Sequence, residues 1–192
     1  MNRALVVVAT LVALLFLWDR ALLDAAHEER AARSRVGRLV SEEERASLPI
    51  AAVRIELGDE GLLYGRVGGA WRCLDFHRAY VDGNAVESLV NKLTRAQGFV
   101  VSDDPGEAKT YGINTTDTVR VVVCGPNVVD DPNHDALVTF DVGTSVPGRD
   151  GAFVRLRGSK EVWAIDSDPR RELTPHAPGL PPLLDPGVVP RT

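Results

Sequence analysis

Short runs of β-branched and aromatic residues dominate the stretch from Asp117 to Asp166 in this 192-residue chain. The runs are Thr118–Cys124, Ala136–Val142, Ala152–Leu156 and Glu161–Ile165. Val, Ile, Phe and Trp suit a pleated, half-buried surface, whereas the Gly, Pro, Asn and Asp clusters between the runs suit reversals of direction. The stretch therefore predicts an antiparallel meander. The other segments are expected to precede this meander in the chain, to cover it or to follow it.

Alternating and hairpin patterns come before this meander. Val53, Ile55 and Leu57 alternate with charged residues, which is the period-two sign of a strand with one buried face. The runs Leu62–Val67 and Ala70–Leu74 flank Gly68-Gly69, a two-residue connection that closes hairpins. Three further strands are therefore expected.

A helix is expected between the hairpin and the meander. Asn84 is a good N-cap with Glu87 three residues later, and Gly98 is the expected C-cap. Apolar residues recur at helical spacing between them: Val86, Leu89, Val90 and Leu93. Residues 49–173 are therefore expected to form one α+β domain, a mainly antiparallel sheet of hairpins with one covering helix.

An uncharged run, Ala4–Trp18, precedes the domain. Extended through Leu23, with Arg20 snorkelling, it reaches the length that crosses a bilayer core. We expect residues 1–23 to be a transmembrane anchor, with a cleavable signal peptide as the alternative. The domain is expected to face the periplasm or outside of a bacterial inner membrane, as a single-pass protein, although a bare count of flanking arginines favours the opposite orientation.

Two appendages flank the domain. Residues 24–48 are rich in Ala, Glu and Arg, with Glu29/Arg33 and Arg38/Glu42 at i, i+4 spacing, and are expected to form a helical stalk or a solvated linker. Ala32, Val36, Leu39 and Val40 form a narrow apolar strip on it. Residues 174–192 are Pro-rich and are expected to be disordered or extended, with Leu180–Leu184 as a conceivable docking motif.

Composition excludes some functions. The formal net charge of −5 argues against a nucleic-acid partner, since a phosphate backbone requires a basic face. Cys73 and Cys124 lack the paired spacing of a zinc site. They are expected to be small buried residues, with one disulfide between them as the alternative.

No familiar catalytic motif occurs, and the histidines are scattered: His27, His77, His134 and His176. We therefore expect no enzyme, no catalytic residue, no metal site and no cofactor. The acidic loop is the one local cluster with metal-binding chemistry, but its residues are also ordinary turn formers: Asp130, Asp131, Asn133, His134 and Asp135.

Two weaker signals remain. Most of the larger aromatics could line a cleft for a sugar or peptide, although core and sheet-edge packing is the expected role: Tyr64, Trp71, Phe76, Tyr80 and Trp163. Asn114-Thr115-Thr116 matches a glycosylation sequon, a pattern short enough to recur by chance.

A family pattern runs through about Ile50–Leu173. Its pieces are Val53-Arg-Ile-Glu-Leu, Gly69-Ala-Trp71-Arg-Cys-Leu, the helix Val81–Leu93, Tyr111-Gly112-Ile113, Val142-Gly143, Ala152-Phe-Val-Arg-Leu and Glu161-Val-Trp-Ala-Ile-Asp. In this order they resemble domain-of-unknown-function family 4340. Members of that family are typically anchored by one N-terminal helix, and many are encoded beside ABC transporters of the gliding-motility auxiliary type. The chain departs from the family pattern in Trp163, where Tyr is common, and in the long loop Gly125–Asp135.

The resemblance implies a non-catalytic, membrane-anchored accessory or scaffold protein of a cell-envelope transport or motility complex. An extracytoplasmic module that binds a sugar, peptide or metal is the alternative. The expected partners are the membrane and other proteins of a membrane complex, and no nucleic acid. Contacts with a protein partner are expected along Gly143–Gly151 and Gly125–Asp135.

Overall fold

The computed structural model describes residues 36–58, 60–126, 136–173 and 182–183. The expected transmembrane segment 1–23, the acidic loop and most of the Pro-rich tail lie outside these residues. Among the helices that are described, none has the length and apolar character needed to cross a bilayer.

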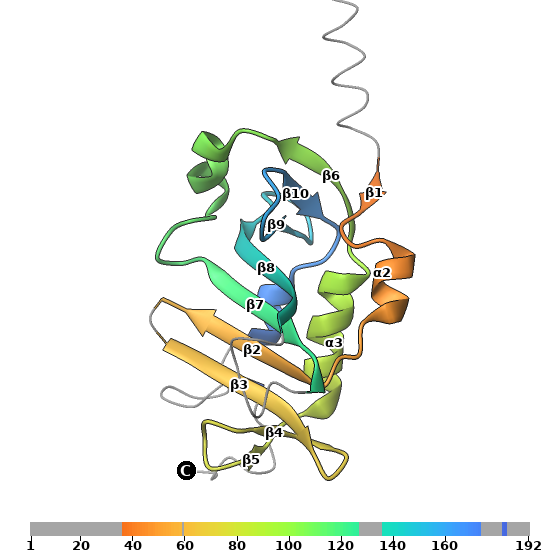
Figure 1. Ribbon diagram of the computed structural model, residues 1–192. Helices are drawn as coiled ribbons and strands as arrows, with labels where there is room; N and C mark the ends of the chain where they lie inside the picture. The colour runs from red at the N-terminus through yellow and green to blue at the C-terminus, as the bar shows by residue number, and fades with distance from the viewer. Residues whose placement is uncertain (1–35, 59, 127–135, 174–181, 184–192) are drawn as a thin grey trace, which may run out of the picture. The chain divides into compact units, whose positions relative to one another are not determined.

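The domain is built on one sheet of ten strands, and every described strand pair is antiparallel (Figure 1). The strand order is β1-β6-β10-β9-β8-β7-β2-β3-β4-β5. The strands are β1 Gly37–Arg38, β2 Ala52–Leu57, β3 Glu60–Val67, β4 Ala70–Cys73, β5 Ala79–Tyr80, β6 Gln97–Ser102, β7 Val119–Cys124, β8 Ala136–Ser145, β9 Ala152–Leu156 and β10 Val162–Ile165. The helices are α2 Glu42–Ser47, α3 Gly83–Thr94 and the 3-10 helices η1 Pro105–Tyr111 and η3 Pro169–Leu173.

The structure confirms the expected sheet-rich α+β domain. Strands β7 to β10 lie side by side in chain order as the predicted meander, and β3 pairs with β4 across Gly68-Gly69. The long-range pairings were not anticipated. Strand β2 joins the meander to the first hairpin by pairing with both β7 and β3, and β6 lies between β1 and β10.

Helix α3 covers one face of the sheet, as expected, and this face is called the buried face below (Figure 1). The helix buries Val86, Leu89, Val90, Leu93 and Thr94. The four apolar residues of this set belong to the same cluster as inward-facing strand residues, among them Val53, Val121, Phe140 and Val154. Helix α3 and the strands thus contribute apolar side chains to one core, and this shared core joins the helix layer to the sheet.

Both ends of α3 differ from the expected caps. Asp82, not Asn84, is the N-cap, because its carboxylate accepts hydrogen bonds from the amides of Asn84 at 2.9 Å and Ala85 at 3.3 Å. The helix ends at Thr94 with Arg95 as the C-cap, and Gly98 lies in β6 instead. A Cβ atom at Gly98 would lie 2.2 Å from the carbonyl oxygen of Ala164, so this glycine permits the close approach of β6 and β10.

Residues 36–48 differ from the stalk expected over 24–48, and residues 24–35 lie outside the described part. Gly37 and Arg38 form β1 and pair with β6. Ser41 and Glu44 then form a capping box that begins α2 as a separate short helix. The i, i+4 ion pair of Arg38 with Glu42 is present, but it joins β1 to α2.

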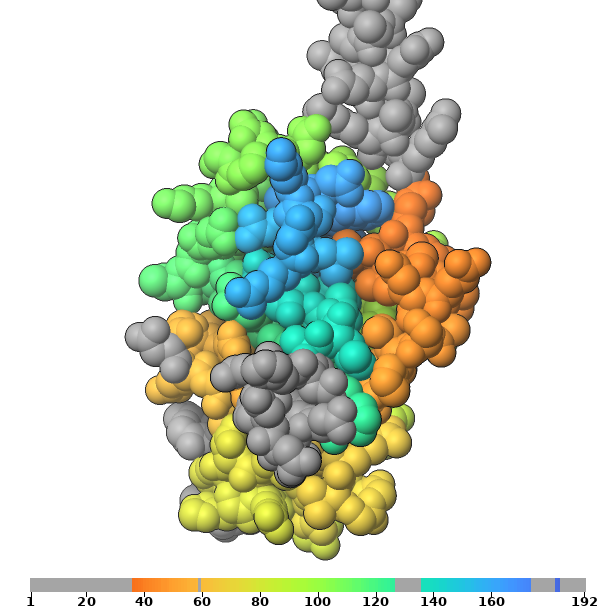
Figure 2. Space-filling model, viewed as in Figure 1, coloured from red at the N-terminus to blue at the C-terminus, as the bar shows by residue number. Residues whose placement is uncertain are grey.

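Two members of the apolar strip of the expected stalk, Leu39 and Val40, belong to the core instead, whereas Val36 is exposed. Leu39 and Val40 are each 5% exposed and lie in the main apolar cluster. Burial of one such side chain contributes about 1.5–3 kcal/mol, whereas an exposed i, i+4 pair contributes about 0.2–0.5 kcal/mol to a helix. Burial of Leu39 and Val40 therefore outweighs the ion pairs of a solvated helix and determines the structure of residues 36–48. Figure 2 shows β1 and α2, in orange, forming one continuous surface with the meander, in cyan to blue.

Pro182 and Leu183, in the segment expected to be disordered or extended, pack against the domain. The Leu183 side chain is 2% exposed and belongs to the main core cluster. The hydroxyl of Tyr64 donates to the Pro182 carbonyl oxygen at 2.9 Å, and the amide of Asp82 donates to the Leu183 carbonyl oxygen at 2.9 Å. This two-residue contact is called the Leu183 clip.

The free energy that holds the Leu183 clip is small. Leu183 has a φ of 63°, a left-handed conformation that costs a non-glycine residue about 1–2 kcal/mol. Ordering the backbone of two residues costs about 1–2 kcal/mol each. Against these costs stand the burial of one leucine, about 1.5–3 kcal/mol, and two hydrogen bonds of about 0.5–1.5 kcal/mol each. The favourable and unfavourable contributions of the clip are therefore of about the same size.

The placement of Leu39 in the core generates a stability prediction. Replacement Leu39→Ala should lower the free energy of unfolding by about 3 kcal/mol, because it removes buried methyl groups and leaves a cavity. The matched change Leu57→Ala, at a leucine that is 53% exposed, should lower it by less than about 1 kcal/mol. Urea denaturation followed by circular dichroism measures both. Equal effects of the two changes would contradict the assignment of residues 36–48 to the domain.

Candidate functional site

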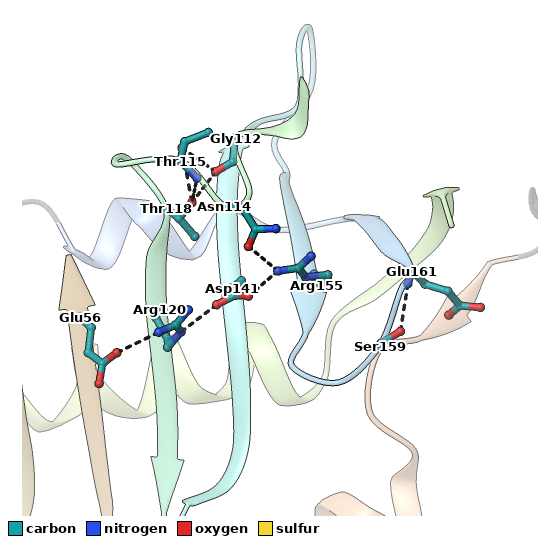
Figure 3. Close-up of polar contacts among 10 residues, drawn as sticks. All are labelled: Glu56, Gly112, Asn114, Thr115, Thr118, Arg120, Asp141, Arg155, Ser159 and Glu161. Carbon is teal, nitrogen blue, oxygen red and sulfur yellow. Dashed lines mark hydrogen bonds and ion pairs between the residues drawn. The ribbon is translucent and has the colours of Figure 1, made fainter. Parts of the chain in front are cut away.

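A row of alternating charges crosses four adjacent strands on the face of the sheet opposite α3, called the outer face (Figure 3). The strand register places Glu56 of β2 opposite Arg120 of β7, Arg120 opposite Asp141 of β8, and Asp141 opposite Arg155 of β9. Successive side chains of a strand point to opposite faces, so each of these residues is flanked in sequence by residues that face α3. We call these four residues the charged row.

Asp141 is the centre of the charged row. Its Oδ1 accepts from Arg120 Nε at 2.9 Å and its Oδ2 accepts from Arg155 Nη2 at 2.9 Å, while its side chain is only 4% exposed. Arg120 Nη1 also approaches Glu56 Oε2 at 3.4 Å at the more exposed end of the row. One buried carboxylate thus binds two guanidinium groups, so the charges of the row are largely compensated on the outer face.

This arrangement stabilises the charged form of Arg120. The hydrogen bond to Asp141 raises the pKa of Arg120 above its usual value, and the charges of Asp141 and Glu56 add to this effect. An arginine with a raised pKa stays protonated across the physiological range. The cross-strand pairs of the charged row are therefore suited to fixing the strand register.

Two glycines of the family pattern position the loop at one end of the charged row. Gly112 ends η1 in a left-handed conformation, with φ 73°. Gly143 of β8 lies directly beside this loop, since a Cβ atom there would be 2.1 Å from the carbonyl oxygen of Tyr111. Only glycine allows both the turn and this approach. The motifs Tyr111-Gly112-Ile113 and Val142-Gly143 therefore meet in space.

Asn114 follows directly from this loop and extends the charged row. Its Oδ1 accepts from Arg155 Nη2 at 2.7 Å, and its backbone φ is 62°. The loop is closed by Thr118, whose Oγ1 donates to the Gly112 carbonyl oxygen at 3.0 Å and accepts from the Thr115 amide at 2.8 Å. The asparagine of the sequon thus serves as a hydrogen-bond partner of Arg155.

A polar hollow of about 300 Å³ lies at the other end of the charged row. Its lining residues are Arg54, Glu56, Gly58, Glu60, Gly61 and Asp75. Three of the six are acidic and one is basic, so the hollow carries an excess of negative charge. Asp75 is fixed by the hydrogen bond that its Oδ2 accepts from the Leu63 amide at 2.8 Å. Among the residues described, no three His, Cys, Asp or Glu side chains are grouped so as to hold a metal ion.

The five aromatic candidates do not gather around a cleft. Tyr64 and Trp71 are buried in the main core, and Phe76 packs against that core. Tyr80 is 52% exposed on the edge strand β5, where the Arg72 guanidinium lies 3.2 Å from its ring centroid. Trp163 lies on β10, far from these strands in the sheet order. The expected role in core and sheet-edge packing is confirmed.

Cys73 and Cys124 are both buried and unpaired with each other, as expected. Cys73 belongs to the main core on the buried face, whereas Cys124 belongs to a small cluster with Ala52, Leu63 and Val122 on the outer face. Opposite faces of one sheet cannot be bridged by a disulfide. Burial also raises the pKa of the Cys73 thiol, which keeps it in the unreactive protonated form.

The remaining candidates contribute no site to the described residues. His77 is an exposed turn residue with a φ of 50°. His27, His134, His176 and the acidic loop lie outside the described residues. Of the expected partner surfaces, the segment Gly143–Gly151 is described, and it is tied to η3 by Arg170 and Arg171. Arg170 Nη1 donates to the Gly143 carbonyl oxygen at 2.7 Å, and Arg171 forms an ion pair with Asp150 at 3.1 Å.

The charged row was not identified from the sequence, although a signal for it exists. Arg120, Asp141 and Arg155 each interrupt an otherwise apolar run, and the runs are consecutive strands of the predicted meander. Charges that alternate in sign between consecutive strands indicate cross-strand pairs. The participation of Glu56 could not be inferred in this way, because it depends on the long-range pairing of β2 with β7.

The burial of Asp141 generates a second stability prediction. Replacement Asp141→Asn should lower the free energy of unfolding by about 2–3 kcal/mol, because it leaves two partly buried guanidinium groups without their shared carboxylate. The matched change Glu56→Gln, at the exposed end of the row, should cost less than about 1 kcal/mol. Urea denaturation at neutral pH measures both changes. A cost at Asp141 no larger than that at Glu56 would show that the charged row is not centred on Asp141.

Three comparisons with known proteins bear on this domain. No curated protein matches the chain, and no solved structure matches it. The model of one family, described as Domain of unknown function (DUF4340), matches residues 71–177. The matched range begins at Trp71 in β4 and includes α3, the whole meander and η3. The chain belongs to the DUF4340 family.

Proposed function

We propose that the protein is a non-catalytic accessory or scaffold protein of a cell-envelope transport or motility complex. Residues 1–23 anchor it in the membrane as a single-pass protein, and its domain faces the periplasm or outside. In this role the domain binds other proteins of the complex and carries out no reaction. The apolar run Ala4–Trp18 supports the anchor, since its composition suits a bilayer core.

The charged row is the observation that carries the non-catalytic role. Its buried carboxylate is bound by two arginines, which form a compensated ion-pair network. Catalytic sites instead hold groups whose pKa values are moved toward the working pH. Beside the row, the outer face offers a polar hollow and exposed carboxylates, which suit recognition of a basic partner surface.

Membership of the DUF4340 family supports the envelope part of the proposal. The resemblance noted in the sequence links such domains to one N-terminal membrane helix and to ABC transporters. The alternative is an extracytoplasmic ligand-binding module. The polar hollow favours a small cationic ligand for that alternative, because its lining residues carry an excess of negative charge.

Recovery of partner proteins tests the scaffold role. The tagged full-length protein, purified from detergent-solubilised membranes, should retain transporter subunits. The change Glu60→Lys should lower their recovery about fivefold or more, because it places a like charge against a basic partner surface. Glu43→Lys, the same change at an exposed residue of α2, should leave recovery unchanged. Quantitative mass spectrometry measures both. Purification of a lone protein carrying a small ligand would favour the ligand-binding alternative.

The orientation of the domain is tested separately. Alkaline phosphatase fused after the domain should be active, because this enzyme folds only outside the reducing cytoplasm. A green fluorescent protein fused at the same point should be dark when exported through the general secretion route. The reverse pair of results, with fluorescence and no phosphatase activity, would place the domain in the cytoplasm.

A further inference from the structure

The turn between β4 and β5, the last two strands at one edge of the sheet, holds two large side chains where the backbone favours glycine (Figure 1). The Ala79 amide donates to the Phe76 carbonyl oxygen at 2.9 Å, and φ is 50° at His77 and 52° at Arg78 between them. A turn with positive φ at both central positions is normally built from asparagine and glycine. The turn between β3 and β4 has Gly68-Gly69 at such positions. Strain retained by large residues at a turn is typical of positions that serve binding.

The arginines of this turn and of β4 have no acidic partner within the described part of the chain. Arg78 is exposed, and it forms no hydrogen bond or ion pair with any residue that the structure describes. Arg72 lies opposite Tyr80, and its guanidinium is 3.2 Å from the centroid of that ring. Stacking on an aromatic ring orients a guanidinium and leaves its N–H groups free to donate. Since Tyr80 is 52% exposed, these three residues form a basic surface that we call the turn patch.

The polar hollow lies next to the turn patch and carries the opposite charge. Asp75, one of its lining residues, directly precedes the turn. The turn lies beside the start of β3, because the Leu74 amide donates to the Leu63 carbonyl oxygen at 2.7 Å and the Asp75 carboxylate accepts from the Leu63 amide. Glu60, at that start of β3, is exposed and also lines the hollow. A basic surface and an acidic hollow therefore lie side by side on the domain.

Neighbouring surfaces of opposite charge are complementary to each other under a two-fold rotation. The rotation sets the basic surface of each copy against the acidic hollow of the other, so both contacts form together. Within the described residues of one copy, no ion pair joins Arg78 to Glu60, which leaves both charges available. The hollow, of about 300 Å³, lies at the lower end of the size range of small-molecule pockets and can receive the end of an arginine side chain. Arginine and tyrosine are also residue types that often dominate the binding energy of protein interfaces.

We infer that the turn patch of one copy binds the polar hollow of a second copy, so that the protein forms a two-fold symmetric dimer. In this dimer Arg78 forms an ion pair with Glu60 of the partner subunit, and Arg72 and Tyr80 contact the rim of the same hollow. Both ion pairs lie at the surface, so the dimer is expected to weaken as salt is added. The inference does not rest on the proposed envelope role, because the occupant of the hollow is the chain itself and residues 1–23 take no part in the interface.

Charge reversal on the full-length protein tests the interface. Sedimentation equilibrium at low salt, in detergent matched in density to the solvent, measures the dimerisation constant. The unchanged protein should form dimers. Arg78→Glu alone or Glu60→Lys alone should weaken the dimer at least about tenfold, because each change sets like charges against each other at both contacts. An equimolar mixture of the two variants should form dimers again, because opposite charges then meet at both contacts.

Matched changes elsewhere separate the interface from an effect of net charge. Arg157→Glu, in the turn between β9 and β10, and Glu43→Lys, in α2, reverse the same two kinds of charge at exposed residues outside the turn patch and the hollow. Alone or mixed, these two variants should dimerise as the unchanged protein does. A loss of dimers in Arg157→Glu as large as that in Arg78→Glu would show that net charge controls association, and it would overturn the inference.

A further variant separates binding from folding. Arg78→Gly removes the side chain and the backbone strain together, so the variant should resist urea at least as well as the unchanged protein. Its dimer should nevertheless be about fivefold weaker, because two surface ion pairs are lost. Circular dichroism checks the fold of every variant. The inference is overturned if the unchanged protein stays monomeric, if its dimers survive both charge reversals, or if the mixed variants associate no better than each does alone.

Discussion

The antiparallel register of β2, β7, β8 and β9 is the constraint on which the rest of the structure depends. Because side chains alternate between the faces of a sheet, one register sets the contents of both faces. It directs Val53, Val121 and Phe140 toward α3 and aligns Arg120 with Asp141 on the opposite face. A slip of one residue in any pair would expose the core and separate the charges together, so each face stabilises the register that the other requires.

The elements that could be predicted are those whose signal is local. The run Ala152–Leu156 coincides with β9, and the hairpin around Gly68-Gly69 has the expected partners, because periodicity and turn residues act within a few positions. The order of strands is not local. Strand β2 pairs with β7 across more than sixty residues, and nothing in either segment specifies the other. The place of Glu56 in the charged row could therefore be found only from the structure. The alternating signs of Arg120, Asp141 and Arg155 on consecutive strands, in contrast, are visible in the sequence.

Leu39 and Leu183 show a second limit of sequence reasoning. Each lies in a segment whose composition indicates something other than a core, an Ala, Glu and Arg-rich stretch in one case and a Pro-rich stretch in the other. Composition reports the average behaviour of a segment, whereas burial is decided by single residues. A single leucine whose side chain fits among those of the main cluster is enough to bring a short segment onto the domain. Such positions become visible only when the cluster itself is known.

Strand β10 joins the two parts of the sheet, since β1 and β6 lie on one side of it and the other seven strands on the other side. It also follows every other strand in the chain. The seven strands on one side can pair without β10, whereas the pair β1-β6 joins them only through β10, whose residues follow their β6 partners by sixty positions or more. Contacts of such long sequence separation form slowly. Synthesis of β10 is therefore the step that allows the two parts of the sheet to become one.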